Sequence, residues 1–132
     1  MKQVSGGFLM KKDKFLLGKR SGKKKWAPGC WDIVGGHGLE AEDPLETLKR
    51  EALEEIDINV LHAKLLVSLD IPDESEAKSF IYHIYMITSW KGKAMNVSKE
   101  HTKIRWFTRD QLENLELALP VYLQLIDAWL KV

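Results

Sequence analysis

Three glutamates, Glu51, Glu54 and Glu55, are the residues whose types and spacing most clearly favour chemistry. At about 100° per residue of an α-helix, they fall within an arc of roughly 100° and share one face. Like charges three or four residues apart repel each other, and a solvated helix face usually mixes in lysines. Clustered carboxylate oxygens are the ligands that Mg²⁺ and Mn²⁺ prefer. The spacing therefore predicts a divalent metal site, with an ordinary solvated helix face as the alternative.

Arg50 supplies a cation beside this cluster. It precedes Glu54 by one helical turn, so it can pair with that carboxylate or with Glu42 in the preceding loop. A pair of this kind would hold a carboxylate in one orientation, as groups surrounding a metal site do.

The residues around the cluster resemble the Nudix box. Gly36, Glu42 and the run REALEEIDI over residues 50–58 follow its pattern of a glycine, a glutamate and an Arg-Glu-apolar-any-Glu-Glu-any-Gly-apolar run at the same spacing. The similarity to MutT-related Nudix hydrolases continues in three flanking stretches: residues 15–20, 31–37 and 100–107. The sequence departs from the family at Asp57, where the box has a glycine, and at Ala41, where many relatives have one. We expect Asp57 to cost about 1 kcal/mol and to leave function intact.

The resemblance implies a Nudix fold, that is, an α+β domain built as an αβα sandwich around a central mixed β-sheet. It also implies Mg²⁺-dependent cleavage of a phosphoanhydride in a nucleoside diphosphate derivative, with Mn²⁺ as a substitute ion. By position, the metal ligands would be Glu51, Glu54 and Glu55, with the carbonyl of Gly36 as a further ligand.

Other residues would support the reaction. By the same resemblance, Arg50 and Glu42 would form an ion pair at the catalytic helix. Glu100 best matches a later glutamate that in some relatives adds a metal ligand or acts as general base. Glu51 and Glu100 are both candidates for that base, since neighbouring carboxylates raise a pKa.

Four further residues are expected to contact the substrate. Arg20, at the end of its strand, takes the place of a basic residue that often contacts substrate phosphate in this family, and Lys19 belongs to the same basic segment. Trp26 lies in a Gly- and Pro-containing loop, where an exposed ring can stack on a base. His37 borders the metal site and suits a substrate contact better than a place among hard oxygen ligands.

The most specific interpretation is a MutT-like (deoxy)nucleoside triphosphate pyrophosphatase that releases a nucleoside monophosphate and pyrophosphate. The alternatives are hydrolysis of ADP-ribose or another nucleoside diphosphate sugar, and a non-catalytic Nudix domain that senses nucleotides. The intact glutamate cluster disfavours the last of these, because a silent scaffold gains nothing from the repulsion.

The elements that position these residues follow from turn signals and hydrophobic periodicity. Asp43 as N-cap, Pro44 at the first helical position and Glu46 closing a capping box predict a helix from Pro44 to about Ile56. Strands are expected over residues 6–10, 15–19, 31–34, 65–70, 79–90 and 103–107, with residues 73–76 as a polar connection. Shorter helices are expected from Thr108 and over residues 120–130. The run over 80–87 is nearly continuously apolar, as in a central strand covered on both faces.

Length and charge limit the remaining possibilities. The 132 residues are expected to form one domain, residues 1–132. Twenty Lys and Arg against nineteen Asp and Glu give a net charge of +1, which argues against a protein that coats nucleic acid or a membrane. One cysteine and no long apolar run at the start favour a cytoplasmic location. The expected partner is a small nucleotide, and the chain could be a monomer or a homodimer.

Overall fold

A mixed β-sheet organises the computed structural model, which describes residues 2–74 and 78–131. In chain order the elements are β1 (Lys2–Lys11), β2 (Lys14–Arg20), β3 (Trp31–Asp32), β4 (Val34–His37), α1 (Pro44–Ile56), β5 (Asn59–Asp73), β6 (Lys78–Lys91), β7 (His101–Thr108), α2 (Arg109–Leu112) and α3 (Val121–Leu130). The sheet follows the order β3-β2-β1-β6-β5, while β4 pairs with β1 and β7 pairs with β2. β1 runs parallel to β6, and the other pairs are antiparallel.

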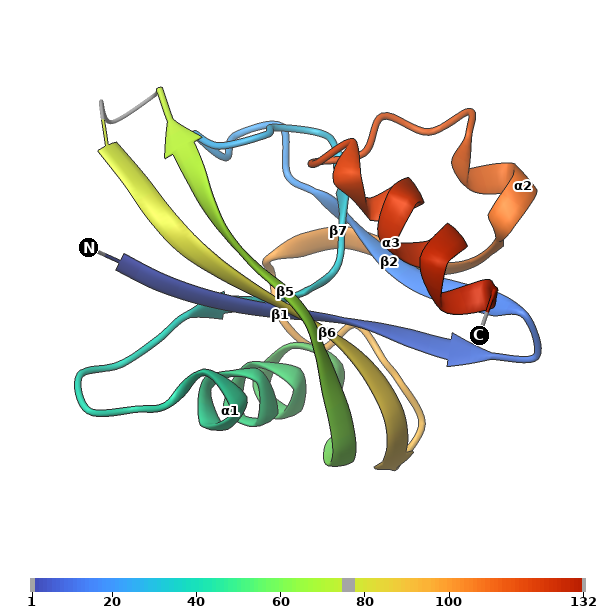
Figure 1. The fold of residues 1–132 in the computed structure, drawn as a ribbon, viewed down its shortest axis with the longest axis horizontal. Helices are drawn as coiled ribbons and strands as arrows, with labels where there is room; N and C mark the ends of the chain where they lie inside the picture. The colour runs from blue at the N-terminus through green and yellow to red at the C-terminus, as the bar shows by residue number, and fades with distance from the viewer. Residues whose placement is uncertain (1, 75–77, 132) are drawn as a thin grey trace.

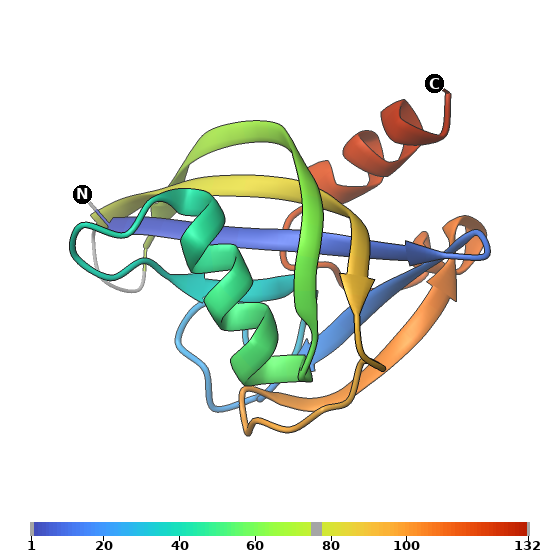
Figure 2. The ribbon, with the colours of Figure 1, turned by 90° about the horizontal axis from the view of Figure 1, so that it is seen from below.

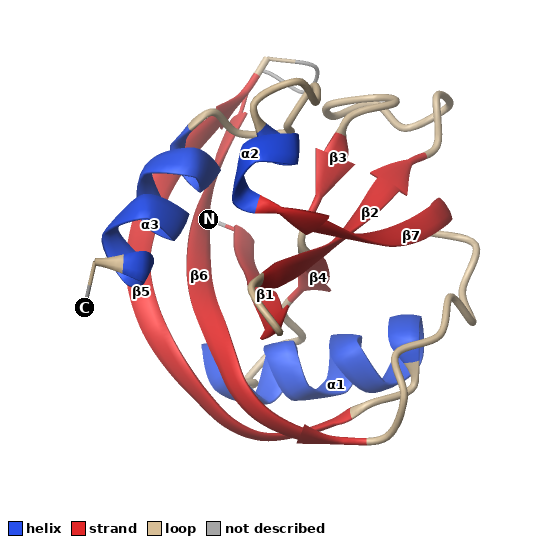
Figure 3. Cartoon of the chain, turned by 90° about the vertical axis from the view of Figure 1, so that its right-hand side faces the viewer, coloured by secondary structure: helices blue, strands red, loops and turns tan. Residues whose placement is uncertain are grey.

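Helices cover the sheet on two sides, which confirms the predicted αβα arrangement. Figure 1 shows α1 on one side of the strands and α2 with α3 on the other. β5 and β6 curve from the α3 side around to α1 (Figure 3), and α1 crosses β1 when the molecule is seen from below (Figure 2). Each side has its own core. Leu48, Ala52 and Ile56 of α1 belong to one, and Tyr122 and Ile126 of α3 belong to the other.

The predicted strands are present, with different bounds. β5 and β6 are longer than expected because they pair with each other along nearly their whole lengths. β6 lies between β1 and β5, as its continuous apolar run predicts. The single strand expected over 31–34 is wrong: β3 pairs with β2, whereas β4 pairs with β1 and includes the two glycines at 35 and 36. Residues 75 and 76 of the predicted connection lie outside the described residues.

α1 begins and ends where the sequence predicts. The Asp43 side chain accepts a hydrogen bond from the backbone N–H of Glu46, and the Glu46 side chain accepts one from the backbone N–H of Asp43. This capping box satisfies two backbone donors that the helix itself leaves unpaired. At the other end, Asp57 adopts the left-handed conformation (φ 58°, ψ 41°) and its N–H donates to the carbonyl of Leu53. The residues that α1 carries are therefore fixed at both ends.

Asp57 and Ala41 both have positive φ, at the two positions where family members often have glycine. We expect Asp57→Gly to raise the free energy of unfolding by about 0.5–1 kcal/mol, because glycine adopts this conformation without steric cost. Denaturant unfolding measures the change. Lys49→Gly, at an exposed position inside α1, is the control and should instead lower stability by about 1 kcal/mol. A destabilised Asp57→Gly variant would show that the aspartate side chain itself caps the helix.

Within the described residues, no helix combines the length and apolar character needed to cross a membrane.

Candidate active site

α1 presents its three glutamates to different surroundings. Glu55 is buried, with 3% of its surface exposed, and its carboxylate accepts a hydrogen bond from the backbone N–H of Gly35 at 3.3 Å. The Glu51 side chain is 15% exposed and that of Glu54 is 57% exposed. The helix face that the three glutamates share thus runs from the protein interior at Glu55 to solvent at Glu54.

Two glycines of β4 allow this face to approach the sheet closely. A Cβ atom added at Gly36 would lie 2.5 Å from the carboxyl carbon of Glu51, and one at Gly35 would lie 2.0 Å from the backbone carbonyl oxygen of Ser5. Any side chain at these positions would push α1 or β1 away. The glycine pair therefore sets the distance between the Glu51 carboxylate and the strand.

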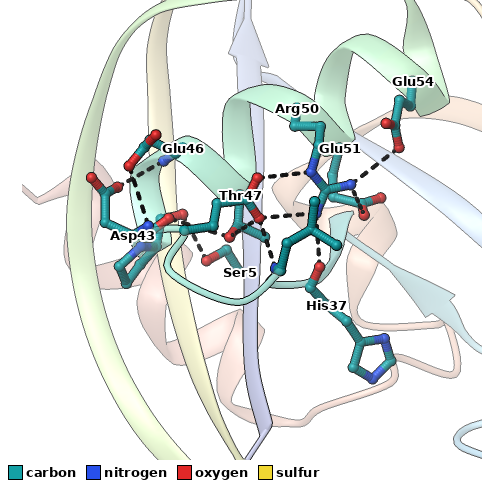
Figure 4. Close-up of polar contacts among 11 residues, drawn as sticks. Ser5, His37, Asp43, Glu46, Thr47, Arg50, Glu51 and Glu54 are labelled. Atoms are coloured by element: carbon teal, nitrogen blue, oxygen red, sulfur yellow. Dashed lines mark hydrogen bonds and ion pairs between the residues drawn. The ribbon is translucent and has the colours of Figure 1, made fainter.

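Arg50 organises the polar residues around the helix (Figure 4). Its Nε and Nη2 atoms donate to the two carboxylate oxygens of Glu42 at 2.9 and 3.0 Å, and Nη2 also donates to the carbonyl of His37 at 2.8 Å. Its Nη1 donates to Glu51 at 2.8 Å and to Glu54 at 3.2 Å. Both pairings considered from the sequence are present, since one guanidinium holds Glu42 and Glu54 together.

The hydrogen bonds from Arg50 stabilise the ionised form of Glu42 and lower the pKa of that carboxyl to about 2. The backbone N–H of Leu39 and the Thr47 hydroxyl also donate to Glu42. The Glu42 carboxylate thus joins the loop between β4 and α1 to the helix, because it accepts hydrogen bonds from donors in both.

Glu55 is perturbed in the opposite direction. Burial penalises its charged form, and the nearby carboxylate of Glu51 adds repulsion, so the pKa of Glu55 rises to about 9. Glu100 contributes further repulsion from the loop before β7. Two neighbouring carboxylates therefore disfavour the charge on Glu55.

The carboxylate oxygens of Glu51, Glu54 and Glu55 are of the kind that binds a divalent cation. Among the described residues, no three His, Cys, Asp or Glu side chains lie close enough together to hold a metal ion, and Glu51 and Glu54 are instead paired with Arg50. A bound Mg²⁺ or Mn²⁺ would relieve the repulsion around Glu55, and it would take the hard carboxylate oxygens as its ligands. Glu51, Glu54 and Glu55 remain the predicted ligands.

A cavity of about 310 Å³ opens beside the acids. Glu55, Gly36 and Glu100 line it, and so do Asp32, Tyr82 and Phe80. Lys24 forms an ion pair with Glu100 and lowers the pKa of that carboxyl. The cavity lining therefore combines charged and aromatic side chains.

The residues predicted to contact substrate are distributed unevenly around this cavity. Arg20, Trp26 and His37 line it, and Lys19 is not among its lining residues. Arg20 lies beside the Trp26 ring, 5.1 Å from its centroid, and donates to the Trp26 carbonyl at 2.9 Å. Trp26 is half-buried and packs edge-to-face on Phe80 at 5.6 Å, so it is less exposed than its loop position suggested.

Asp32 is a lining residue to which the sequence assigned no site role, and Lys24 is one whose run of three lysines predicts either a solvated turn or a segment that draws in a polyphosphate. Asp32 could have been noticed as an acidic residue inside the apolar stretch 31–34, a pattern that favours a buried polar function. Lys24 belongs to a run of three lysines, which is more often a solvated turn. Nothing in the sequence distinguishes Lys24, which forms the ion pair with Glu100, from the two lysines that flank the same loop position.

We expect Arg50→Lys to weaken Mn²⁺ binding by about 10- to 100-fold, because lysine keeps the charge and loses the fork that holds Glu42, Glu51 and Glu54 together. Titration followed by electron paramagnetic resonance measures the affinity. Arg109→Lys is a matched control. Arg109 donates through two nitrogens to the carboxylate of Asp127 and through the third to Glu113, four residues later, and none of these residues belongs to the proposed metal site. Equal affinities for wild type and Arg50→Lys would contradict a positioning role for Arg50.

Known proteins resemble this chain in sequence and in structure. The NUDIX domain family matches residues 2–128. An 8-oxo-dGTP diphosphatase of Buchnera aphidicola subsp. Schizaphis graminum is 29% identical over 114 residues, which cover 86% of this chain and 82% of that protein. The 8-oxo-dGTP diphosphatase of Proteus vulgaris is 30% identical over 92 residues, covering 68% and 79% respectively. A MutT NUDIX hydrolase of Burkholderia pseudomallei superposes with a TM-score of 0.76 at 26% identity, covering 83% and 84%.

Proposed function

This chain belongs to the NUDIX domain family, and on that premise we propose that it is a Mg²⁺-dependent nucleoside triphosphate pyrophosphohydrolase. It would cleave between the α and β phosphates and release a nucleoside monophosphate and pyrophosphate. The two curated relatives carry the name 8-oxo-dGTP diphosphatase, which makes oxidised and ordinary purine deoxynucleoside triphosphates the first substrates to test.

The observation that carries the proposal is the cavity that begins at the glutamate face of α1. Glu55 and Glu100 line it together with the cations Lys24 and Arg20, which suits a polyphosphate and its counterion. The rings of Trp26 and Phe80 also line it and suit a flat base. A nucleotide combines these two chemistries, a polyphosphate and a flat base.

A phosphoanhydride is shielded by negative oxygens, so its hydrolysis needs charge neutralisation, an activated water and a stabilised leaving group. Bound Mg²⁺ supplies the positive charge that neutralises the phosphates and acidifies water. Glu51, Glu54 and Glu55 would hold the ion, and the carbonyl of Gly36 would be a further ligand. Arg50 is a positioning residue, because its Nη1 donates directly to the carboxylates of Glu51 and Glu54 while Glu42 accepts from its Nε and Nη2.

The proton of the attacking water goes to a carboxylate, with Glu51 and Glu100 as the two candidates. Lys24 holds Glu100 in its ionised form and lowers its pKa, which makes Glu100 a weak base while the pair lasts. A phosphate oxygen entering the cavity would compete with Glu100 for Lys24. Release of Glu100 would then coincide with substrate binding.

A hydrolysis screen tests the proposal. With Mg²⁺, we expect 8-oxo-dGTP and the common nucleoside triphosphates to give monophosphate and pyrophosphate, and EDTA to stop turnover. Faster cleavage of ADP-ribose or nucleotide sugars would favour the alternative hydrolase. Failure to turn over any of these compounds, while nucleotides still bind, would favour a non-catalytic sensor.

A further inference from the structure

His101 is a buried histidine that the reaction outlined above does not use. It is the first residue of β7, it is 7% exposed, and it lines the cavity. Its side chain makes no hydrogen bond within the described part of the chain, and its Nδ1 atom is fully buried. Buried polar atoms are usually hydrogen-bonded, so an unpaired one at a cavity calls for a functional explanation.

The imidazole ring is held in place by the sheet. β7 pairs with β2 (Figure 3), and His101 is the Cα partner of Arg20. A Cβ atom added at Gly18 would lie 2.5 Å from the ring atom Cδ2 and 2.6 Å from Cγ, so the ring packs directly on this glycine. Asn96 Nδ2 donates to the His101 carbonyl at 3.0 Å, which fixes the backbone at the same point. The ring therefore lies against the sheet and is not turned out to solvent.

The burial of Nδ1 determines which ring nitrogen carries the proton. Among backbone groups, a buried N–H without an acceptor is rarer than a buried acceptor without a donor. The same asymmetry places the lone pair on Nδ1 and the proton on Nε2. Nε2 is not among the buried atoms, so it is the nitrogen at the cavity surface. His101 thus offers one N–H donor to a molecule in the cavity.

The neighbours of His101 indicate what that molecule must supply. Arg20 is its partner on β2, Lys24 pairs with the preceding residue Glu100, and both cations line the cavity. Arginine and lysine side chains are donors only. An oxygen that accepts from two cations and an N–H is one that carries negative charge, as the oxygens of a phosphate chain do. The donors gathered here therefore suit a polyphosphate.

We propose that His101 binds the polyphosphate of the substrate, with its Nε2–H donating to a non-bridging phosphate oxygen between Arg20 and Lys24. An uncharged donor suits this position, because a lysine or arginine at residue 101 would itself attract the carboxylate of Glu100. The inference rests on the proposed function for the identity of the substrate. The anion contact itself can be measured with an inorganic polyphosphate.

Calorimetric titration with inorganic tripolyphosphate in the presence of Mg²⁺ tests the contact. We expect His101→Phe to weaken binding about 10- to 100-fold, because a hydrogen bond to a charged oxygen is lost. His101→Gln should recover most of the affinity, since its amide nitrogen reaches the place of Nε2. His101→Asn should resemble His101→Phe, since its shorter amide reaches only the place of Nδ1. Equal affinities in the two amide variants, or no loss in His101→Phe, would overturn the inference.

His83→Phe is a matched control on the same sheet. Both ring nitrogens of His83 already have protein partners, Ser68 Oγ at 2.7 Å and Gln3 Oε1 at 2.6 Å. Side chains alternate along a strand, so His83 lies on the face of β6 opposite its neighbour Tyr82, which lines the cavity. We expect His83→Phe to bind tripolyphosphate as tightly as wild type does.

Nitrogen-15 nuclear magnetic resonance of the histidine rings gives an independent measurement. The signals missing from the spectrum of His101→Phe identify the ring of His101. We expect them to show the tautomer with its proton on Nε2, and the Nε2 resonance to shift when tripolyphosphate is added. A proton on Nδ1, or an unchanged Nε2 resonance at saturating tripolyphosphate, would contradict the contact.

Hydrolysis of dGTP by the same variants separates this inference from the proposed function. His101→Phe should raise KM more than it lowers kcat, because a contact made in both the ground state and the transition state changes mainly KM. Tripolyphosphate binding that depends on His101, without any nucleotide hydrolysis, would support the anion contact and contradict the proposed reaction. Hydrolysis in which neither KM nor tripolyphosphate affinity depends on His101, or a wild type that binds no tripolyphosphate, would overturn the inference and leave the proposed reaction standing.

Discussion

Glu54→Gln is expected to lower kcat about 10²- to 10³-fold and to change the free energy of unfolding by no more than about 0.5 kcal/mol. The Glu54 side chain is more than half exposed, and its ion pair with Arg50 lies at the surface, where such pairs contribute little stability. Its carboxylate is nevertheless one of the three proposed metal ligands, and losing one stabilising charge costs a large factor in rate. Steady-state kinetics at saturating Mg²⁺ and urea unfolding measure the two effects.

Glu113→Gln is a close control for this substitution. Glu113 is 60% exposed and pairs with Arg109 four residues earlier at 3.1 Å, as Glu54 pairs with Arg50 at 3.2 Å. Glu113 follows α2, which Figure 1 shows on the other side of the strands from α1. We expect Glu113→Gln to keep wild-type activity. Undiminished activity in Glu54→Gln would remove Glu54 from the metal site.

The stability of the metal-free protein is expected to fall as pH rises from 6.5 to 9, by up to about 1.4 kcal/mol per pH unit. Burial and the Glu51 carboxylate raise the pKa of Glu55 from 4.5 to about 9. The folded state therefore retains a proton that the unfolded state has released, and the stability that this proton provides is lost as pH approaches 9. His101 has its pKa lowered by burial to about 4, so its contribution is lost only below pH 6.5.

Guanidinium unfolding in EDTA at pH 6.5, 8 and 9 measures this dependence. Glu55→Gln, which is neutral at every pH, should flatten the curve and be more stable than wild type at pH 9. Saturating Mg²⁺ should flatten it for wild type alone, because the ion favours the ionised Glu55. A pH-independent wild type in EDTA would show that the folded protein already ionises Glu55 at neutral pH.

The helix that carries the glutamates could be predicted from the sequence because its determinants are local. Asp43, Pro44 and Glu46 specify its start, and the spacing of Leu48, Ala52 and Ile56 specifies which face is buried. The pair of Arg50 with Glu42 was also predictable. Glu42 lies in the loop just before the helix and Arg50 lies on the helix eight positions later, so the two side chains can meet locally. The order of the strands depends on pairings between distant segments, such as the parallel pairing of β1 with β6, which no local signal predicts.

Contacts between distant segments account for what sequence reasoning missed. Asp32 meets Tyr122 ninety residues later, and Lys24 meets Glu100 seventy-six residues later. The burial of Glu55 depends on β4 fitting against α1, which the glycines at 35 and 36 permit. The split between β3 and β4 arises because neighbouring residues of one short segment pair with different strands. No pattern within one element contains this information.

The central claim is that the glutamates of α1 hold a divalent ion that makes this Nudix hydrolase cleave a nucleoside triphosphate between its α and β phosphates. Phosphorus nuclear magnetic resonance of 8-oxo-dGTP incubated with the protein tests it most directly. With Mg²⁺, we predict resonances of the monophosphate and pyrophosphate, and no reaction in EDTA. Orthophosphate and diphosphate as the products, or unchanged turnover in EDTA, would contradict the claim.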